Sequence, residues 1–411
     1  MKATDVFTPQ RLPTVTLVSD HLGDMTDAYN SVMDEGGKLV RVVGPSKSGK
    51  TVFIKRAVGD DMVLVTGAGI TATDHLWIRV LHGIGSDVGV EEGRADSRGG
   101  GFKVSGELEG NVIVAKGKVA GEVARDRASE TSATRTKAVD LVQQVIKDLG
   151  GSGLTVFIDD FHYIPPDIQQ ELAQQIKQVV EHGVRIAAAA VPFRSEDALR
   201  ANDDLQGRIK DFEFDYWDAD ELVEIAHKGF GELNIECSTE YAKALAAEAA
   251  GSPQLMQSLC LETCREMKVS ETLEHRVAVP NGREFFAAVC QRVAGSVDFS
   301  TTIKVMRDGP LTRGSPRKAY VLKDGSAADV YQIIVRAIAS DPPSLHFPYT
   351  DLQSRIANLC SGESPHVSDP CKHIAKLVND RFQSDKIDWD VEQHLFSIRD
   401  PYLLFGVRWG D

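Results

Sequence analysis

Eight consecutive residues near the N-terminus combine glycines with a lysine and a hydroxyl at a spacing that suits phosphate binding. They match G-x-x-x-x-G-K-[ST] at every fixed position and are Gly44, Pro45, Ser46, Lys47, Ser48, Gly49, Lys50 and Thr51. In such a loop, glycines let backbone N–H groups curl around phosphate oxygens, and the following helix N-terminus adds positive potential. Lys50 would reach the β- and γ-phosphates, and the Thr51 hydroxyl would coordinate Mg²⁺. The loop therefore predicts a site for a nucleoside triphosphate and its magnesium ion.

Hydrolysis of a bound nucleotide also requires carboxylates, and two adjacent aspartates follow an apolar run at residues 154–158. We expect Asp159 to hold the magnesium shell and Asp160 to orient or deprotonate the attacking water. A purely structural role for Asp160, capping the segment that follows, is the alternative. His162 either senses the γ-phosphate or is a packed loop histidine.

The elements that must position these groups are nearly continuous apolar runs, as expected of strands that are covered on both faces. Amphipathic helical segments separate the runs, which span residues 39–43, 62–65, 154–158 and 184–191. The phosphate loop lies between the first run and a helical segment, the context that the motif requires. The sequence therefore predicts an α/β domain with a parallel sheet.

Residues 86–133 interrupt this pattern between the second and third runs. They contain a glycine-rich stretch, residues 97–101, and then apolar residues that alternate on either side of a turn at Gly110-Asn111. Two exposed strands joined by a turn fit this segment. Because its charges alternate in sign, we expect a solvated hairpin insertion; the alternative is an element that grips a partner or a substrate.

The pattern becomes helical after Phe214. Helices are expected at residues 220–230 and 238–250; Gly251 ends the second, Ser252 caps the next, and Pro253 takes its first turn. Near the C-terminus, three helices precede two strands, an order typical of a winged helix-turn-helix; the expected segments are residues 327–339, 349–359, 369–382, 386–390 and 395–399. We therefore expect three domains: a P-loop domain (1–215) with the insertion 86–133, a helical lid (216–300) and a winged-helix-like domain (301–411).

Composition describes a folded, globular chain. Of its 411 residues, 42% are hydrophobic and 26% are charged, which argues against a mainly disordered or fibrous protein. No run approaches the roughly 20 apolar residues that cross a bilayer, and residues 1–11 lack the layout of a signal peptide. We therefore expect a cytoplasmic protein with no membrane partner. The six cysteines form no CxxC pair, so we expect reduced thiols, mostly in the core.

Four features together resemble the AAA+ and STAND branch of P-loop ATPases, nearest to bacterial ATPases related to origin-recognition proteins. They are the phosphate loop, residues 157–162, the Gly251-Ser252-Pro253 turn and the C-terminal winged helix. The resemblance covers nearly the whole chain and implies ATP as the nucleotide, Mg²⁺ as its metal and a homo-oligomer. It also implies that Pro253 lies at the nucleotide, where many AAA+ members place a second sensor arginine; this departure favours the STAND type.

The resemblance implies roles for two arginines and a rate for the reaction. Arg208 falls where related proteins present an arginine to a neighbour's nucleotide, although a pair with Asp204 or Asp211 is the alternative. The expected strand that ends before Pro192 lacks the usual polar sensor residue, which leaves Arg194 as a substitute. Asp160 stands where AAA+ motors commonly have glutamate, and the shorter carboxylate implies slow, switch-like turnover.

The C-terminal module gives a weak case for binding DNA. Its expected recognition helix places three polar side chains on one face: Lys372, Lys376 and Asn379. The strand region that follows carries three carboxylates, and the chain has a formal net charge of -14; both oppose phosphate. A packing or protein-docking surface is therefore favoured. The basic loop at residues 313–318 is the better candidate for a phosphate contact, with a solvated linker as the alternative.

These features support a leading function and two alternatives. The leading hypothesis is a regulatory ATPase switch, in which ATP closes the helical lid over the sheet and changes how protomers or a partner protein dock, in signalling or defence. The alternative is an ATP-controlled DNA-binding or DNA-loading protein. A third hypothesis is a nucleotide-binding scaffold that never turns over.

Overall fold

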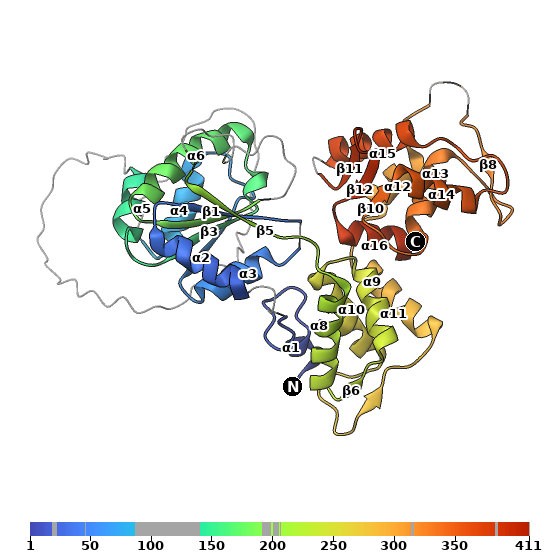
Figure 1. Cartoon of the computed structure of the whole chain (residues 1–411), viewed down its shortest axis with the longest axis horizontal. Coiled ribbons are helices and arrows are strands. Elements are labelled where there is room, and N and C mark those ends of the chain that lie inside the picture. The colour runs from blue at the N-terminus through green and yellow to red at the C-terminus, as the bar shows by residue number, and fades with distance from the viewer. Residues whose placement is uncertain are drawn as a thin grey trace, which may run out of the picture. The chain divides into compact units, whose positions relative to one another are not determined.

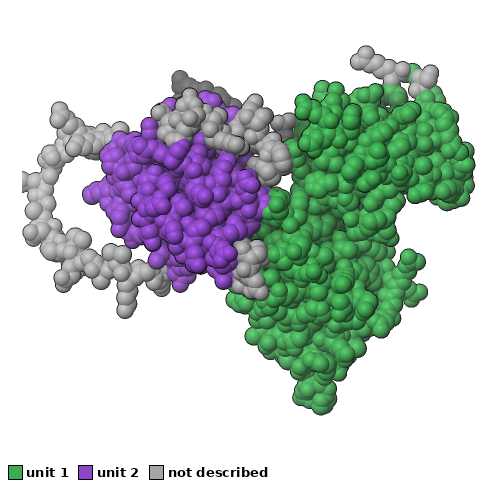
Figure 2. All heavy atoms as spheres, viewed as in Figure 1, with its two compact units in different colours: residues 1–19, 45–49, 215–411 green, residues 20–44, 50–214 purple. Residues whose placement is uncertain are grey.

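The computed structural model describes most of the chain, namely residues 1–18, 23–45, 47–86, 140–190, 199, 205, 207–312, 314, 316–382 and 385–410. The chain divides into two compact units (Figures 1 and 2). Unit 1 comprises residues 1–19, 45–49 and 215–411, and unit 2 comprises residues 20–44 and 50–214. The hairpin expected within residues 86–133 lies outside the described residues. The three-domain division stays a prediction.

A five-stranded parallel sheet forms the centre of unit 2. Its strands are β1 (Leu39–Val43), β2 (Met62–Thr66), β3 (Thr155–Asp159), β4 (Arg185–Ala190) and β5 (Ile209–Glu213). They lie in the order β2-β3-β4-β1-β5, with every neighbouring pair parallel. The predicted α/β class is therefore confirmed. The strand β5 was not expected, because this edge strand has charged residues at three of its five positions and forms no continuous apolar run.

Alternate residues of the strands face two separate cores, one on each side of the sheet. Two helices cover one face, α2 (Gly23–Glu35) and α3 (Lys50–Val58), and three cover the other, α4 (Thr73–Gly83), α5 (Leu141–Leu149) and α6 (Pro166–Glu181) (Figure 1). On the first face, Tyr29 and Phe53 pack with Phe157 of β3. On the second, the fully buried Trp77 packs with Ile158. Burial on both faces explains why the inner strands are almost entirely apolar.

The remaining elements belong to unit 1. In chain order they are α1 (Ala3–Val6), α8 (Ala219–Glu232), β6 (Ile235–Glu236), α9 (Thr239–Ala249), α10 (Pro253–Glu266), β7 (Val277–Ala278), α11 (Arg283–Gly295), α12 (Ser300–Asp308), β8 (Tyr320–Val321), β9 (Ala327–Ala328), α13 (Val330–Ala339), β10 (His346–Pro348), α14 (Tyr349–Leu359), α15 (Ser368–Phe382), β11 (Ile387–Asp390), β12 (Leu395–Ile398) and α16 (Pro401–Trp409). One continuous apolar core runs through them. No helix among the described residues is both long and apolar enough to span a membrane.

Helix boundaries in unit 1 follow local capping chemistry. The Ser252 hydroxyl accepts a hydrogen bond from Leu255 N at 3.2 Å, and Pro253 opens α10, as the sequence predicted. The helix expected at residues 327–339 starts later, at Val330, because Asp329 forms a capping box with Gln332. The residues before it pair with β8 instead.

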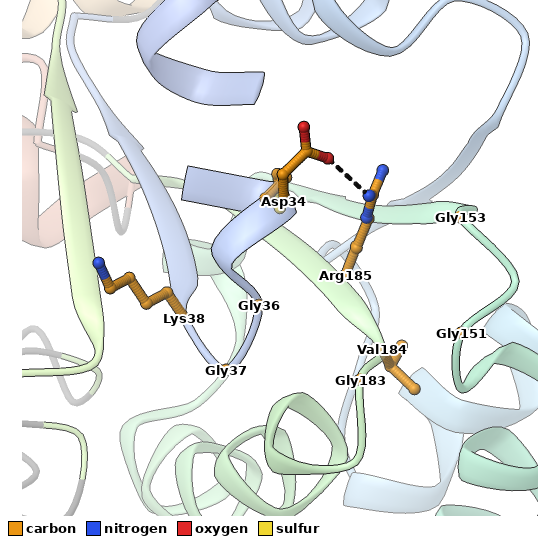
Figure 3. Close-up of a pocket in the computed structure, with 10 residues that line it drawn as sticks. Asp34, Gly36, Gly37, Lys38, Gly151, Gly153, Gly183, Val184 and Arg185 are labelled. Carbon is orange, nitrogen blue, oxygen red and sulfur yellow. Dashed lines mark hydrogen bonds and ion pairs between the residues drawn. The ribbon is translucent and has the colours of Figure 1, made fainter. Parts of the chain in front are cut away.

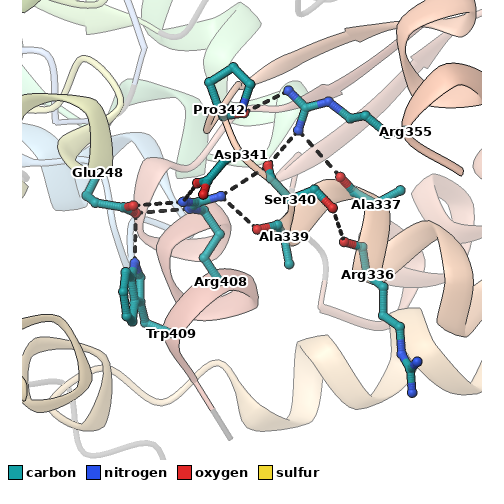
Figure 4. Close-up of polar contacts among 10 residues, drawn as sticks. All are labelled: Glu248, Arg336, Ala337, Ala339, Ser340, Asp341, Pro342, Arg355, Arg408 and Trp409. Carbon is teal, nitrogen blue, oxygen red and sulfur yellow. Dashed lines mark hydrogen bonds and ion pairs between the residues drawn. The ribbon is translucent and has the colours of Figure 1, made fainter. Parts of the chain in front are cut away.

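A buried ion-pair network joins α9, α16 and the end of α13 (Figure 4). The Glu248 carboxylate accepts hydrogen bonds from Arg408 at 2.7 and 2.9 Å and from Trp409 Nε1 at 2.8 Å. Arg408 also donates to the Ala339 carbonyl at 2.7 Å and pairs with Asp341 at 2.6 Å. The side chains of Arg408 and Glu248 are only 5% and 7% exposed. Because buried charges are stable only when they are paired, this network fixes the position of α16 against α9.

All six cysteines are free thiols, and five of them are buried. Burial raises the pKa of the buried thiols, which keeps them protonated and unreactive. Most of the cysteines therefore lie in the core, as expected.

Candidate nucleotide-binding site

The expected phosphate loop follows β1 at the carboxyl-terminal edge of the sheet. Gly44 N donates to the Ala190 carbonyl of β4 at 3.1 Å, and α3 begins at Lys50. Lys47 and Gly49 take positive φ values of 66° and 97°. Glycine suits the second of these because it has no Cβ. A turn of this kind before a helix N-terminus directs backbone N–H groups toward an anion. Ser46, also expected to bind the nucleotide, lies outside the described residues.

Lys50 carries a charge that is largely removed from water. The residue is 9% exposed, and its Nζ donates to the Gly44 carbonyl at 2.9 Å. Burial lowers the pKa of Lys50 to about 8, while the nearby carboxylates of Asp159 and Asp160 act in the opposite direction. A phosphate would stabilise the charged ammonium further, so the environment of Lys50 fits the role that the motif predicts.

The two residues expected to hold magnesium are in direct contact. Thr51 Oγ1 donates to Asp159 Oδ2 at 2.7 Å, and Asp159 Oδ1 accepts from Asp160 N at 2.9 Å. Hydroxyl and carboxylate oxygens are hard ligands that suit Mg²⁺. Among the described residues, no group of three or more His, Cys, Asp and Glu could hold a metal alone. A magnesium ion here would therefore complete its shell with phosphate oxygens and water, as Mg²⁺ commonly does.

Asp160 adopts the left-handed backbone conformation, with φ 56° and ψ 36°. A 3₁₀ turn, η2 (Phe161–Tyr163), follows it, and Tyr163 N donates to the Asp160 carbonyl at 3.0 Å. The Asp160 side chain makes no capping hydrogen bond to this turn, which removes support for the purely structural alternative. Burial, reinforced by the neighbouring Asp159 charge, raises the pKa of Asp160. Raised carboxylate pKa values and left-handed non-glycine residues both occur preferentially at functional sites.

His162 packs against Tyr163, with ring centroids 4.3 Å apart and planes inclined by 37°. This contact fits the packed-histidine alternative, and the role of His162 stays a prediction.

Arg208 lies at the opposite edge of the sheet from the phosphate loop of its own chain. It precedes β5, and its carbonyl accepts from Leu39 N at 2.8 Å, where β1 starts. Its guanidinium pairs with Glu181 at 3.0 Å. Asp211, one of the partners expected for it, instead binds Arg41 through two hydrogen bonds of 2.7 Å. A role for Arg208 toward a neighbouring protomer stays a prediction, and Arg194 lies outside the described residues.

Within unit 1, Trp217 links the Gly251-Ser252-Pro253 turn to the phosphate loop. Trp217 N donates to the Gly251 carbonyl at 3.0 Å, and its indole Nε1 donates to the Ser48 carbonyl at 3.0 Å. Gly251 has a φ of 80°, and a Cβ at this position would lie 2.4 Å from Tyr216 Cβ, so the turn requires glycine. No motif in the sequence points to Trp217, because a contact across 169 residues leaves no spacing pattern. Contact of Pro253 with the nucleotide stays a prediction.

Lys47 is held by two residues at the start of α16. Its Nζ lies 3.7 Å from an Asp400 carboxylate oxygen and 3.8 Å from the centroid of the Tyr402 ring. The phosphate loop thus contacts side chains from two later segments of unit 1.

A cavity of about 240 Å³ lies at the amino-terminal edge of the sheet (Figure 3). Residues before or at the starts of β1, β3 and β4 line it, including Lys38, Gly153 and Arg185, and Arg185 pairs with Asp34 at 2.9 Å. The phosphate loop follows the other end of β1, so this cavity is separate from the candidate nucleotide site.

The basic groups of the C-terminal segment are partly engaged within unit 1. Arg317 pairs with Asp329 at 2.9 Å and lies over the Tyr331 ring at 4.5 Å, which weakens its case as a phosphate contact. Asn379 donates to the Ile387 carbonyl at 2.6 Å and so fixes the start of β11. Its side-chain amide is therefore engaged within unit 1. The exposed lysines of α15 are Lys372 and Lys376.

No protein-family model and no curated protein matches the sequence. Solved structures resemble it over nearly the whole chain, including a Walker-type ATPase and an ORC2 protein. The Walker-type ATPase of Pyrococcus abyssi is 15% identical with a TM-score of 0.52, covering 95% of this chain and 96% of its own. The ORC2 protein of Aeropyrum pernix, solved as ADPNP-ADP complexes, is 11% identical with a TM-score of 0.50, covering 98% and 96%.

At sequence identities of 15% and 11%, this likeness is evidence for a shared fold and not for a shared function. The chain shares its fold with this Walker-type ATPase and with this ORC2 protein. The expected resemblance to ATPases related to origin-recognition proteins is therefore confirmed at the level of fold, whereas the STAND type and the winged helix stay predictions.

Proposed function

We propose that this protein binds and hydrolyses ATP with Mg²⁺, and that its nucleotide state controls oligomerisation or the docking of a partner protein. The contact between Thr51 and Asp159 carries the proposal. It brings a hydroxyl and a carboxylate from distant segments to one point beside the buried Lys50. The buried Lys50 ammonium lies in the first turn of α3, where the helix N-terminus also favours an anion. A hydroxyl, a carboxylate and an ammonium at this point suit a magnesium-bound triphosphate better than a purely structural contact.

Each of the site residues would have a separate role in hydrolysis. Lys50 would hold the β- and γ-phosphates, and Thr51 and Asp159 would hold Mg²⁺, which supplies charge neutralisation on the phosphates. Asp160 would orient the attacking water and accept its proton, a role that its raised pKa favours because a stronger base takes a proton more readily. The short aspartate side chain supports slow turnover. Arg208 would act on the nucleotide of a neighbouring protomer.

The switch proposal draws support from the partners of the phosphate loop. Trp217 donates to the Ser48 carbonyl, and Lys47 lies against Asp400 and Tyr402. A nucleotide that reshapes the loop would change these contacts and so act on unit 1.

Particle mass in ATP and in ADP tests the switch. We expect a larger particle, or a co-purifying partner retained, in only one of the two nucleotides, and no such difference for Lys50→Ala. Equal mass and equal partner binding in both nucleotides would refute it.

An ATP-controlled DNA-binding protein is the second candidate. The order α13, β10, α14, α15, β11, β12 matches that of a winged helix, and Lys372 and Lys376 are exposed on α15. We expect salt-dependent binding to duplex DNA that is lost when both lysines become glutamate, if this candidate is right. No binding at low salt with ATP present would exclude it.

A further inference from the structure

The turn after β2 lies against the backbone of Asp160. Gly67 N donates to the Asp159 carbonyl at 2.7 Å, which extends the pairing of β2 with β3 by one residue. A Cβ at Gly67 would lie 2.5 Å from the Asp160 carbonyl oxygen, 3.0 Å from its carbonyl carbon and 3.1 Å from Phe161 Cα. All three are backbone atoms, which cannot rotate aside as a flexible side chain can.

Gly67 is not required for its own conformation. Its φ is not positive, unlike that of Gly69 two residues later, so an alanine backbone would be tolerated there. The obstacle to a side chain is the backbone of Asp160 and, at a slightly greater distance, that of Phe161. Asp160, in contrast, is a non-glycine residue in the left-handed region, a conformation that persists only where its surroundings hold it.

The turn itself is fixed from α4. Arg79 Nη1 donates to the Thr66 carbonyl at 2.7 Å and to the Ala68 carbonyl at 2.8 Å, on either side of Gly67. Arg79 therefore holds the turn that brings Gly67 close to Asp160, and the Tyr163 N–H also binds the Asp160 carbonyl.

We propose that Gly67 is a positioning residue for hydrolysis: its missing side chain lets the turn after β2 hold the Asp160 backbone, and so the carboxylate, where the attacking water must be oriented. This inference rests on the proposed ATPase function. It implies that a methyl group at Gly67 displaces Asp160 while leaving Lys50 and Thr51, which bind the nucleotide, in place.

The test compares ATP turnover and ATP affinity for Gly67→Ala. We expect kcat to fall about tenfold or more, because small misplacements of a reacting group are costly, while the Kd for ATP stays within about threefold. The matched control is Gly83→Ala at the end of α4. Its added Cβ would lie 2.8 Å from a side-chain carbon of Val63, a residue of β2. This control disturbs the packing of the same strand away from Asp160, and we expect it to keep the wild-type kcat.

A double-mutant cycle separates positioning from general damage. If Gly67 acts through Asp160, adding Gly67→Ala to Asp160→Asn should lower kcat by less than about twofold further. If Gly67→Ala does not fold, Arg79→Ala releases the turn from a partly exposed position and should lower kcat with ATP affinity retained.

Two outcomes are distinguishable. Wild-type protein that does not hydrolyse ATP contradicts the proposed function itself. Wild-type protein that hydrolyses ATP, with Gly67→Ala as active as Gly83→Ala or with fully additive losses in the cycle, overturns the positioning role alone.

Discussion

Thr51 Oγ1 donates a 2.7 Å hydrogen bond to Asp159 Oδ2 across 108 residues of sequence. The bond joins the first turn of α3 to the carboxyl end of β3, so the two halves of the expected magnesium site meet in the folded chain. Because β3 and β1 are separated by β4 in the sheet, this meeting depends on the strand order as well as on the two motifs.

Removing the Thr51 hydroxyl should weaken the binding of Mg²⁺ at the site. We expect Thr51→Ala to raise the Mg²⁺ concentration for half-maximal ATP hydrolysis by about tenfold or more, since even outer-shell changes cost that much in metal affinity. Thr51→Ser keeps the hydroxyl and serves as the control, with a magnesium dependence near that of the wild type. Equal magnesium curves for Thr51→Ala and Thr51→Ser would contradict the assignment.

Asp160→Asn should separate binding from chemistry. We expect kcat to fall by about 10² to 10⁴, the usual contribution of a general base, with little change in the Kd for ATP. Burial raises the pKa of Asp160, and the base works only when it is deprotonated. As pH falls, the kcat of the wild type should therefore start to decline at a higher pH than it would if Asp160 had the pKa of an ordinary aspartate. A mutant with wild-type kcat would remove Asp160 from the reaction.

ATP affinity should depend on the titration of Lys50. Burial lowers its pKa to about 8, and bound phosphate favours the protonated form, so binding raises that pKa. Affinity is then full below pH 8 and is lost as pH rises above it, with Kd increasing by up to about tenfold per pH unit. Lys50→Arg keeps its charge over this range, so any binding it retains should be independent of pH. Calorimetry in two buffers measures the linked proton uptake, and none at alkaline pH would refute the prediction.

The ion pair between Glu248 and Arg408 should matter for stability. We expect Glu248→Ala to lower the free energy of unfolding by about 3 kcal/mol, because it leaves a buried guanidinium short of its main partner. The control is Asp308→Asn, which breaks an exposed pair with Lys304 and should cost less than about 0.5 kcal/mol. Urea denaturation measures both, and equal losses would mean that the network does not stabilise unit 1.

The sequence predicted those parts of the site that depend on local pattern. The phosphate loop, the aspartates at the end of β3 and the cap at Ser252 lie within short segments whose chemistry determines their conformation. The position of the helix at Val330 differed by three residues from expectation, because the capping box at Asp329 overrides the helical character of the alanines before it.

Contacts between distant segments could not be predicted in this way. The close approach of Gly67 to Asp160 depends on the pairing of β2 with β3, and the bond from Trp217 to Ser48 depends on tertiary packing. The strand β5 escaped notice because an edge strand need not be apolar on both faces. The position of Arg208 could not be predicted either, because it depends on the register of β5 against β1. That register places Arg208 at the end of the sheet where β1 starts.

Release of phosphate from ATP by wild-type protein and by Lys50→Ala, with Mg²⁺ and then with EDTA, tests the central claim most directly. We predict slow release by the wild type with Mg²⁺, and none above background with EDTA or with Lys50→Ala. Equal release by both proteins, or no release by a wild-type protein that binds ATP, would contradict ATP hydrolysis at this site.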